Sequence, residues 1–310
     1  MHLLVTGGAG FIGSHLATAL LRRGDSAVIV DDLSFGSTQG LPHSPGLKLI
    51  RFRLGQTVPD ELGSHEFDAI IHLAGQSSVR LSWEDPLEAH DRNVTATVSL
   101  LEFCGKNKIP RFILASSAAV YGTPESLPIG ENSLCSPLSP YGLQKLACEH
   151  YLKSFSRHYG FSGIALRLFN VYGPRQQPNS SEVISTFLRA IKQRRPMIVE
   201  GDGTQTRDFI FVDDVVWAIS SSVDIKCTDG STQIFNIGTG TSHSVLEVAQ
   251  TLLAGADSPN ELQFVPNRSG DISHSQADIT AARSVLGFEP QWSLSQGLET
   301  LMRSAVPADA

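Results

Sequence analysis

Tyr141 and Lys145 are the residues of this sequence whose types and spacing point most directly to chemistry. They stand four positions apart in segment 140–145, which has a helical pattern, so both side chains lie on one helix face. A lysine ammonium beside a phenol favours the phenolate and lowers a pKa that is about 10 in water. The pair could therefore supply a general base that works near neutral pH. The same spacing on its own would also arise by coincidence on a surface helix.

Two serine hydroxyls follow an apolar run upstream of this pair. Ser116 and Ser117 come directly after residues 112–115, which have the pattern of a buried strand. The carboxyl ends of parallel strands form the edge at which open α/β sheets bind ligands. We therefore expect these hydroxyls to lie at a ligand-binding edge.

A glycine-rich turn follows the first apolar run of the chain. Residues 3–6 lead into a G-x-x-G-x-x-G pattern and then into a helical segment. Glycine is needed where the backbone turns sharply beside a pyrophosphate, and the N–H groups at a helix N-terminus bind that anion. The expected phosphate-binding residues are Gly7, Gly10, Phe11, Ile12 and Gly13. A glycine turn without a ligand would show the same pattern.

A pair of carboxylates indicates which dinucleotide this loop would take. The next apolar run ends in Asp31 and Asp32, and Asp31 comes 18 residues after Gly13. A carboxylate at that place accepts hydrogen bonds from the adenosine ribose hydroxyls and repels a 2′-phosphate. No Arg or Lys stands in residues 33–39 to receive such a phosphate. The sequence therefore predicts NAD as the cofactor.

The elements that must position these residues alternate regularly through the first half of the chain. Helical patterns fall between short apolar runs, most of which are apolar on both faces, as in a covered parallel sheet. The alternation predicts an α/β fold with a Rossmann doubly wound parallel sheet. The predicted strands are residues 3–6, 27–31, 47–52, 69–73, 112–115 and 163–168, and the predicted helices are 11–23, 87–107 and 140–159.

The pattern becomes irregular after Asn170. We predict an NAD-binding domain over residues 1–168, with a returning segment near 209–238, and a smaller C-terminal α/β substrate-binding domain mainly over 169–310. The elements predicted there are helices near 182–194, 213–223, 244–253, 278–286 and 293–303, and strands at 197–200 and 233–237.

Composition bounds the class of protein. The chain has 310 residues, of which 41% are hydrophobic and 18% charged, as in a globular protein rather than a disordered one. Its net charge of −7 offers no basic surface for nucleic acid. No apolar run approaches the roughly 18 residues of a membrane span, and glycine interrupts the opening segment too early for a signal peptide. The four cysteines form no C-x-x-C pair, so neither a metal site nor a disulfide framework is expected. These features predict a soluble cytoplasmic protein.

Taken together, the motifs resemble those of the extended short-chain dehydrogenase/reductases of the NAD-dependent epimerase/dehydratase family. The resemblance covers nearly the whole chain and implies a nucleotide-sugar substrate and tightly held NAD⁺ that first removes a hydride from the sugar. It also implies cofactor contacts from Leu73, Ala74, Gly75 and Asn93, in addition to Tyr141, Lys145 and the residues above. The further matching segments are 31–34, 72–75, 116–122, 141–145, 167–174, 207–209 and 268–271.

The residues before Val120 discriminate between reactions within this family. Nucleotide-sugar 4,6-dehydratases have Asp-Glu there and the decarboxylating relatives a Glu, whereas this chain has Ala118 and Ala119, which transfer no proton. The resemblance therefore implies reversible oxidation at C4, in which Tyr141 takes the 4-hydroxyl proton and Ser117 hydrogen-bonds O4. Hydride returning to the opposite face of a 4-keto intermediate gives the C4 epimer.

Two other classes stay open. A 4,6-dehydratase, or another NAD-dependent enzyme that modifies nucleotide sugars, would have to recruit its acid and base from outside this motif. A non-catalytic NAD-binding sensor would have no reason to keep Ser117, Tyr141 and Lys145 together.

The resemblance also assigns residues to the substrate. Arg207 and Arg268 match pyrophosphate-binding arginines, since an arginine fork suits phosphate oxygens. Asp271 matches a residue that binds the nucleotide ribose, and Asn170 one that contacts the phosphate or sugar. Each could instead form an ordinary surface salt bridge or polar contact. Ser77 and Ser78 are further candidates for contacts to the sugar.

Ser275 indicates which sugar is accepted. Segment 268–275 resembles that of 4-epimerases that take N-acetylated sugars, in which a small residue at this position leaves room for the acetamido group and a tyrosine excludes it. We therefore predict a UDP-hexose 4-epimerase that interconverts UDP-GlcNAc with UDP-GalNAc and also UDP-Glc with UDP-Gal, in polysaccharide biosynthesis. Relatives are commonly homodimers, so the helices at 87–107 and 140–159 are the expected interface.

Two residues depart from the family pattern. Arg53 stands where relatives have an acidic residue that contacts the adenine amino group, which predicts a weaker hold on NAD. Gln76 replaces a lysine of some relatives, which leaves the substrate's negative charge with one cation fewer.

Overall fold

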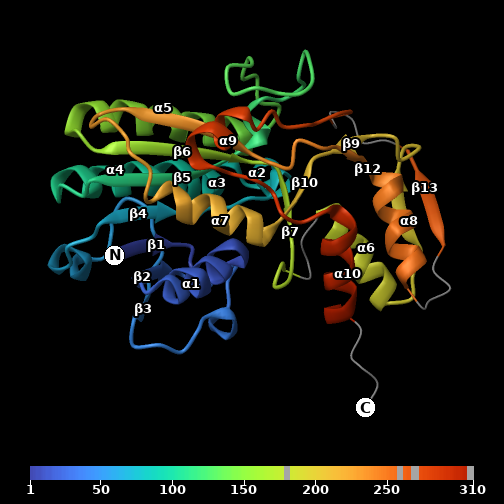
Figure 1. Cartoon of the computed structure of the whole chain (residues 1–310), viewed down its shortest axis with the longest axis horizontal. Helices are drawn as coiled ribbons and strands as arrows, with labels where there is room; N and C mark the ends of the chain where they lie inside the picture. Colours follow the sequence, from blue (N-terminus) through green and yellow to red (C-terminus); the bar gives the residue numbers. More distant parts are fainter. Residues whose placement is uncertain (178–181, 257–260, 267–271, 306–310) are drawn as a thin grey trace.

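A seven-stranded parallel sheet forms the centre of the protein (Figure 1). The structure, a computed structural model, describes residues 1–177, 182–256, 261–266 and 272–305. The strand order is β11-β6-β5-β4-β1-β2-β3, and every neighbouring pair is parallel. The predicted doubly wound α/β fold is therefore confirmed. The strands are β1 (His2–Thr6), β2 (Ser26–Asp31), β3 (Leu47–Arg51), β4 (Ala69–His72), β5 (Arg111–Ser117), β6 (Ser162–Leu168) and β11 (Thr232–Ile237).

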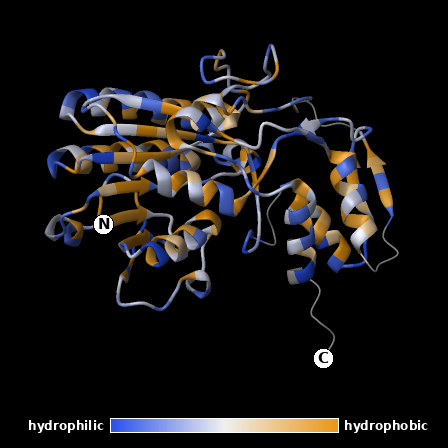
Figure 2. Cartoon of the chain, in the orientation of Figure 1, coloured by the Kyte–Doolittle hydropathy of each residue, from blue (hydrophilic) through white to orange (hydrophobic). Residues whose placement is uncertain are grey.

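Both faces of this sheet are buried, as the apolar strand sequences require. In β1, Leu3 and Val5 belong to one hydrophobic cluster, whereas Leu4 belongs to a second cluster. Successive strand residues point to opposite faces, so the two clusters lie on the two sides of the sheet. Figure 2 shows the resulting concentration of hydrophobic residues in the central strands.

Helices cover both faces, and one predicted helix is divided. The segment predicted as a single helix over 87–107 consists of α3, a π turn at Asp91–Thr95 and α4. The turn holds Asn93 and Arg92, whose side chains bond to other loops, and π turns frequently mark functional sites. The helices are α1 (Phe11–Arg23), α2 (Val79–Glu84), α3 (Pro86–His90), α4 (Ala96–Lys106), α5 (Pro140–Tyr159), α6 (Val183–Lys192), α7 (Val212–Ser222), α8 (Val245–Gly255), α9 (Thr280–Leu286) and α10 (Leu294–Ala305).

Beyond β6 the chain forms short strand pairs and a second group of helices. Helices α6, α8 and α10 pack together at the end of the molecule away from β1–β3 (Figure 1). Segment 232–237 returns to the main sheet as β11, beside β6. The short pairs are β7 (Asn170–Tyr172) with β10 (Phe209–Phe211), β9 (Thr206–Arg207) with β12 (His243–Ser244), and β8 (Met197–Glu200) with β13 (Leu262–Val265).

A buried carboxylate joins these C-terminal segments. Asp208 is fully buried, and its oxygens accept N–H donors from Thr239 at 2.7 Å, Gly240 at 2.9 Å and Ala277 at 3.1 Å. A carboxylate that accepts several backbone N–H groups offsets much of the cost of its burial. Asp208 thereby fixes the segment around residue 277 beside strands β9 and β10.

A second buried network fixes α5. Arg167 on β6 forms two bonds to Glu149 on α5, at 2.7 Å and 3.0 Å, and both side chains are about 95% buried. Arg167 also donates to the Tyr121 hydroxyl at 2.9 Å, and Ser116 on β5 donates to Glu149. Because the pair bridges the helix and two strands, it sets the position of α5 relative to the carboxyl ends of β5 and β6.

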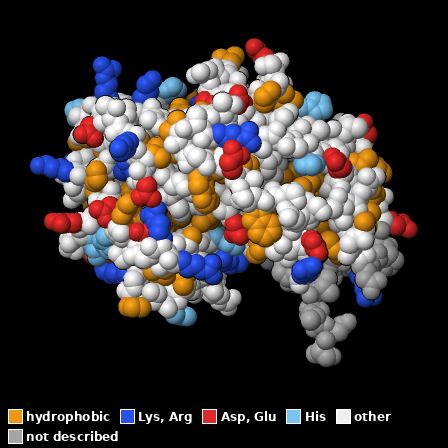
Figure 3. All heavy atoms as spheres, in the orientation of Figure 1, with side chains coloured by type: hydrophobic (Ala, Val, Ile, Leu, Met, Phe, Trp, Pro, Cys, Tyr) orange, Lys and Arg blue, Asp and Glu red, His pale blue; other side chains and the backbone are white. Residues whose placement is uncertain are grey.

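The surface carries mixed charge. On the face shown in Figure 3, basic and acidic side chains are interspersed rather than gathered into one patch. Across the described ranges, every helix is too short or too polar to cross a lipid bilayer.

The Glu149–Arg167 pair yields a stability prediction. Glu149→Gln should lower the free energy of unfolding by about 3–5 kcal/mol, because it leaves a guanidinium buried without its counter-charge. Urea unfolding followed by circular dichroism measures the change. As a matched control, Glu102→Gln removes the exposed partner of Lys106 on α4 and should leave the unfolding midpoint almost unchanged. Equal effects of the two substitutions would contradict this account.

Candidate active site

A cavity of about 590 Å³ lies at the carboxyl ends of the central strands. The strand order reverses between β1 and β4, and open α/β sheets bind ligands at that point. Arg268 and Asp271 lie outside the described residues. The predicted site residues that line the cavity are Gly7, Gly10, Phe11, Ile12, Gly13, Asp31, Asp32, Leu73, Ala74, Gly75, Ser77, Ser78, Ser117, Tyr141, Lys145, Asn170, Arg207 and Ser275.

The glycine loop has the geometry that a pyrophosphate requires. Gly7 has a φ of +70°, and a Cβ there would lie 2.6 Å from the backbone nitrogen of Ala74. A Cβ on Gly13 would lie 2.3 Å from the carbonyl oxygen of Gly7. Helix α1 begins after Gly10 with no side-chain cap and no acidic residue in its first turn. Its first N–H groups therefore point into the cavity mouth as donors for an anion.

Asp31, at the end of β2, is held against this loop. Its two carboxylate oxygens accept N–H donors from Ala9 at 2.9 Å and Leu33 at 2.8 Å. Burial raises the pKa of Asp31, and these hydrogen bonds partly offset that effect. An ionised carboxylate offers about four lone-pair sites, so Asp31 can still accept hydroxyl donors from a ribose.

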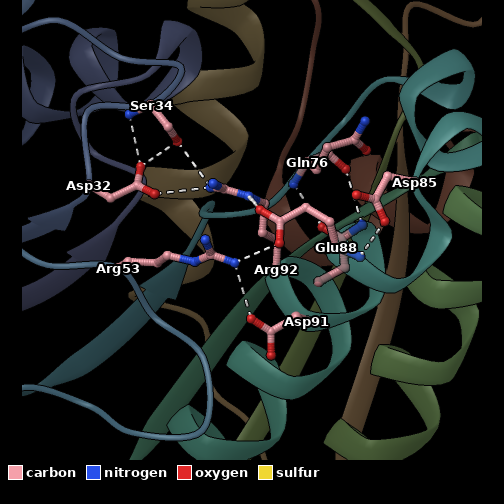
Figure 4. A network of polar contacts seen from close by, with 9 residues as sticks. Asp32, Ser34, Arg53, Gln76, Asp85, Glu88, Asp91 and Arg92 are labelled. Carbon is pink, nitrogen blue, oxygen red and sulfur yellow. Dashed lines mark hydrogen bonds and ion pairs between the residues drawn. The ribbon is translucent and has the colours of Figure 1, made fainter.

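Arg53, which departs from the family pattern, also lines the cavity. Its guanidinium is paired with Glu88 on α3 at 2.7 Å and with Asp91 at 3.3 Å (Figure 4). These two carboxylates compensate the charge of the guanidinium, and the weaker hold on NAD stays a prediction.

Asn93 occupies a supporting place and does not line the cavity. Its buried amide accepts the Gln76 N–H at 2.8 Å and donates to the Gln76 carbonyl at 3.1 Å and to Gln144 on α5 at 2.8 Å. A Cβ on Gly75 would lie 2.6 Å from the Asn93 oxygen. The Asn93 amide thus holds the loop after β4 against α5, and its direct contact with the cofactor stays a prediction.

Tyr141 and Lys145 lie together in the first turns of α5, on the helix face predicted from their spacing. Ser139 caps the helix by accepting the Gly142 N–H at 3.1 Å, and the Tyr141 N–H donates to Ser82 on α2 at 3.1 Å. The Lys145 ammonium lies 5.9 Å from the centre of the Tyr141 ring. It donates to the Ala115 carbonyl on β5 at 2.8 Å.

The protonation of Tyr141 differs from the prediction. Burial raises the pKa of Tyr141 to about 12, and hydrogen bonding with Ser117 offsets only part of this rise. Burial likewise lowers the pKa of Lys145. The predicted lowering of the phenol pKa was wrong, because desolvation by burial raises this pKa more than the hydrogen bond with Ser117 lowers it. A phenol with a pKa of about 12 is protonated at neutral pH.

The residues assigned to the sugar end are gathered by strands β9 and β10. Asn170 donates its N–H to the Asp208 carbonyl at 3.0 Å, and Arg207 donates to the Thr206 carbonyl at 2.9 Å. Ser275 is buried and donates its N–H to the same Thr206 carbonyl at 3.1 Å. The backbone thus fixes Ser275 close to Arg207 in the cavity wall.

Several lining residues were not predicted. Arg92 forms an ion pair with Asp32 at 3.0 Å across 60 positions of sequence, and Phe35 packs beside it. Gln177, which donates to the Phe35 carbonyl, and Glu182 also line the cavity. Arg92 directly precedes Asn93 in the sequence, which gave a reason to consider it. The π turn, which was not predicted, is what brings its side chain to Asp32 at the end of β2.

Comparisons with known proteins place the chain in a family. Residues 3–238 match the model of the NAD dependent epimerase/dehydratase family, and the chain belongs to that family. A UDP-glucose 4-epimerase from Mycolicibacterium smegmatis is 38% identical over 304 residues, which cover 96% of each chain.

Solved structures agree. A UDP-N-acetylglucosamine 4-epimerase from Methanobrevibacter ruminantium, in complex with UDP-N-acetylmuramic acid, is 34% identical, with a TM-score of 0.89 over 98% of each chain. A UDP-glucose 4-epimerase from Thermus thermophilus, in complex with NAD, is 31% identical, with a TM-score of 0.90 over 100% of each chain. The protein is therefore an NAD-dependent enzyme. The glycine cradle and the free first turn of α1 fit this cofactor, which supplies a hydride acceptor when bound.

The geometry of Lys145 yields a prediction on pH dependence. Its ammonium favours the Tyr141 phenolate, so Lys145→Met should raise the phenol pKa further and shift the rising limb of the pH–kcat profile to higher pH. At neutral pH, kcat should fall at least ~100-fold. Turnover of UDP-glucose, measured from pH 6 to about pH 10, tests both effects. Lys153→Met, on the exposed side of α5, serves as control. An unshifted profile in the Lys145 variant would refute the role of the ammonium.

Proposed function

We propose that this protein is a UDP-hexose 4-epimerase. The observation that carries the proposal is the meeting of Tyr141, Ser117 and Lys145 in one cavity with a dinucleotide loop at one end and Arg207 at the other. Tyr141 would accept the proton of the sugar 4-hydroxyl as the C4 hydride leaves for NAD⁺, while Ser117 hydrogen-bonds O4. The 4-keto sugar would then turn over, take hydride on its other face and recover the proton from Tyr141, so that no net oxidation occurs.

The residues after β5 favour epimerisation over loss of water. Ala118 and Ala119 line the cavity directly after Ser117, where the family's dehydratases have an acid and a base. Neither methyl group transfers a proton. A 4,6-dehydratase would need an acid and a base from elsewhere, and Glu182 is a carboxyl of the cavity wall that offers one such group.

The product identifies the reaction. NMR of mixtures of the protein with UDP-GlcNAc or UDP-Glc should show the C4 epimer approaching equilibrium, and Tyr141→Phe should abolish it. A 4-keto-6-deoxy sugar as product, lost in Glu182→Gln, would establish the dehydratase. Full turnover by the Tyr141→Phe variant would refute the mechanism altogether.

The remaining substrate contacts belong to this proposal. Arg207 and Arg268 would bind the pyrophosphate, Asp271 the nucleotide ribose, and Asn170 with Ser77 and Ser78 the phosphate or sugar. Residues 1–168 would mainly bind NAD, and 169–310 mainly the nucleotide sugar. Epimers of UDP-hexoses are sugar donors, which is the ground for a role in polysaccharide biosynthesis.

Ser275 supports acceptance of N-acetylated sugars. Its small buried side chain forms part of the cavity wall next to Arg207, so a bulkier residue would reduce the space for a substituent on the sugar. The relative from Methanobrevibacter ruminantium is named for UDP-N-acetylglucosamine.

Replacement of Ser275 tests this sugar preference. Ser275→Tyr should lower kcat/KM for UDP-GlcNAc at least about tenfold, because the phenol overfills the wall, while turnover of UDP-Glc persists. Ser273→Tyr, at an exposed position two residues earlier, should alter neither activity. If the Ser275→Tyr variant has the same kcat/KM for both substrate pairs as the unchanged protein, Ser275 does not set the sugar preference.

Exposed apolar side chains support a homodimer. Leu143 and Tyr151 on α5, Trp83 on α2 and Leu87 on α3 are 42–82% exposed, and α2 and α3 both contact α5. Large exposed apolar side chains on neighbouring helices are typical of an interaction site. Light scattering should give twice the chain mass of 33.4 kDa, and Leu143→Glu should shift the protein toward monomer. A monomeric unchanged protein would refute the proposal.

A further inference from the structure

Two segments that are far apart in the sequence are bonded to each other at the cavity. The side-chain amide of Gln177 donates to the Phe35 carbonyl, and both residues line the cavity. The Arg175 guanidinium donates to the Gly40 carbonyl at 2.9 Å. The two pairs of partners are separated by 142 and 135 positions of sequence. Residues 174–177, which we call the clasp, therefore join the segment after β7 to the loop after β2.

The loop after β2 rests on the glycine loop and on the start of α1. The Ser37 N–H donates to the Ala9 carbonyl at 3.0 Å, and a Cβ on Gly36 would lie 2.6 Å from the same oxygen. A Cβ on Gly40 would lie 3.1 Å from the Cβ of Ser14 on α1. Because this packing leaves no room for a side chain at position 36, the loop lies close to the groups that would bind a pyrophosphate.

The clasp is anchored to α1 as well. His15 on α1 donates to the Pro174 carbonyl at 2.9 Å, and its other ring nitrogen lies 3.6 Å from the Asp213 carboxylate on α7. Arg175 has a φ of +65°, which residues other than glycine rarely adopt. Such a backbone conformation persists where the surrounding contacts hold it. The clasp is therefore fixed from two sides, by α1 and by the loop after β2.

A bound dinucleotide would lie against the clasp. NAD would have its adenosine ribose at Asp31 and its pyrophosphate at the first turn of α1. The bonded residues Phe35 and Gln177 belong to the wall of this same cavity, and the clasp contacts α1 through His15. Movement of a dinucleotide into or out of the cavity would therefore pass the bonded pair.

We propose that opening of the clasp limits the rate at which NAD enters and leaves the cavity. The bonds from Arg175 and Gln177 are both exposed and both end on backbone carbonyls. Each exposed bond adds little net stability, so the clasp opens without unfolding of the sheet. The two donors are only two residues apart in the sequence, so their bonds break together when the clasp opens.

Exchange of bound NAD tests the proposal. The holoprotein is mixed with a large excess of deuterium-labelled NAD⁺, and native mass spectrometry follows replacement of the bound cofactor. In the double variant Arg175→Met/Gln177→Met, which removes both donors and keeps side chains of similar length, exchange should be at least about fivefold faster than in the unchanged protein, the factor expected from the loss of these hydrogen bonds. A smaller increase would overturn the proposal. Arg175→Gly replaces this variant if it does not fold, since glycine adopts the same φ readily.

Arg175→Met alone separates opening from direct contact with the cofactor. Arg175 lies outside the set of described residues that line the cavity, so it acts on exchange only through the clasp. This single variant should exchange NAD at least about twofold faster than the unchanged protein. An unchanged exchange rate would overturn the proposal.

Two controls exclude other causes of faster exchange. Arg22→Met removes an exposed arginine from α1 and changes the net charge equally, and should leave exchange unaltered. Equal acceleration in this control would show that lost positive charge releases the anionic cofactor, and would overturn the proposal. Urea unfolding followed by circular dichroism should give the double variant the midpoint of the unchanged protein. Faster exchange with a lowered midpoint would show general loosening of the fold, and would also overturn the proposal.

Discussion

The buried ion pair between Glu149 and Arg167 is the interaction on which the site depends most. It bonds α5 to β6, and through Ser116 to β5, so that the first turns of the helix lie over the carboxyl ends of those strands. Tyr141 and Lys145, the proposed reactive residues, lie in these turns. A buried ion pair adds little net stability compared with apolar packing, but it admits few alternative arrangements. We infer that its main contribution here is position, since a shift of α5 by one turn would move Tyr141 away from Ser117.

The adenosine end and the centre of the cavity differ in how their charged groups are compensated. At the adenosine end, Arg53 and Arg92 are each paired with carboxylates, so the wall has fixed donors but little free positive charge. At the centre, Lys145 and Tyr141 are both buried, and burial disfavours the charged form of each. Burial therefore opposes the ionisation of both side chains. We infer that Tyr141 can act as the proposed base only where bound NAD⁺ and substrate add interactions that favour its phenolate.

Much of this arrangement was predictable because its signals are local. The strands of the main sheet and the glycine loop follow from short patterns, and the spacing of Tyr141 and Lys145 places them on one face of α5. Contacts across long stretches of sequence were not predictable: no local pattern joins Arg92 to Asp32, and a π turn divides a segment that resembles one helix. The sign of the Tyr141 pKa shift was missed because burial depends on the packed fold. Strand β9 has two residues, too few for an alternating hydrophobic pattern to be recognised in the sequence. The sequence therefore did not predict that Arg207 lies on a strand.

In the proposed mechanism, one hydride leaves C4 of the sugar and returns to the same carbon within the protein. UDP-Glc or UDP-GlcNAc carrying deuterium at C4 tests it directly when the product is analysed by mass spectrometry and NMR after reaction in ordinary water. The account predicts an epimer that retains the deuterium at C4. Loss of the deuterium to solvent would contradict it, because the hydrogen would then have left as an exchangeable proton.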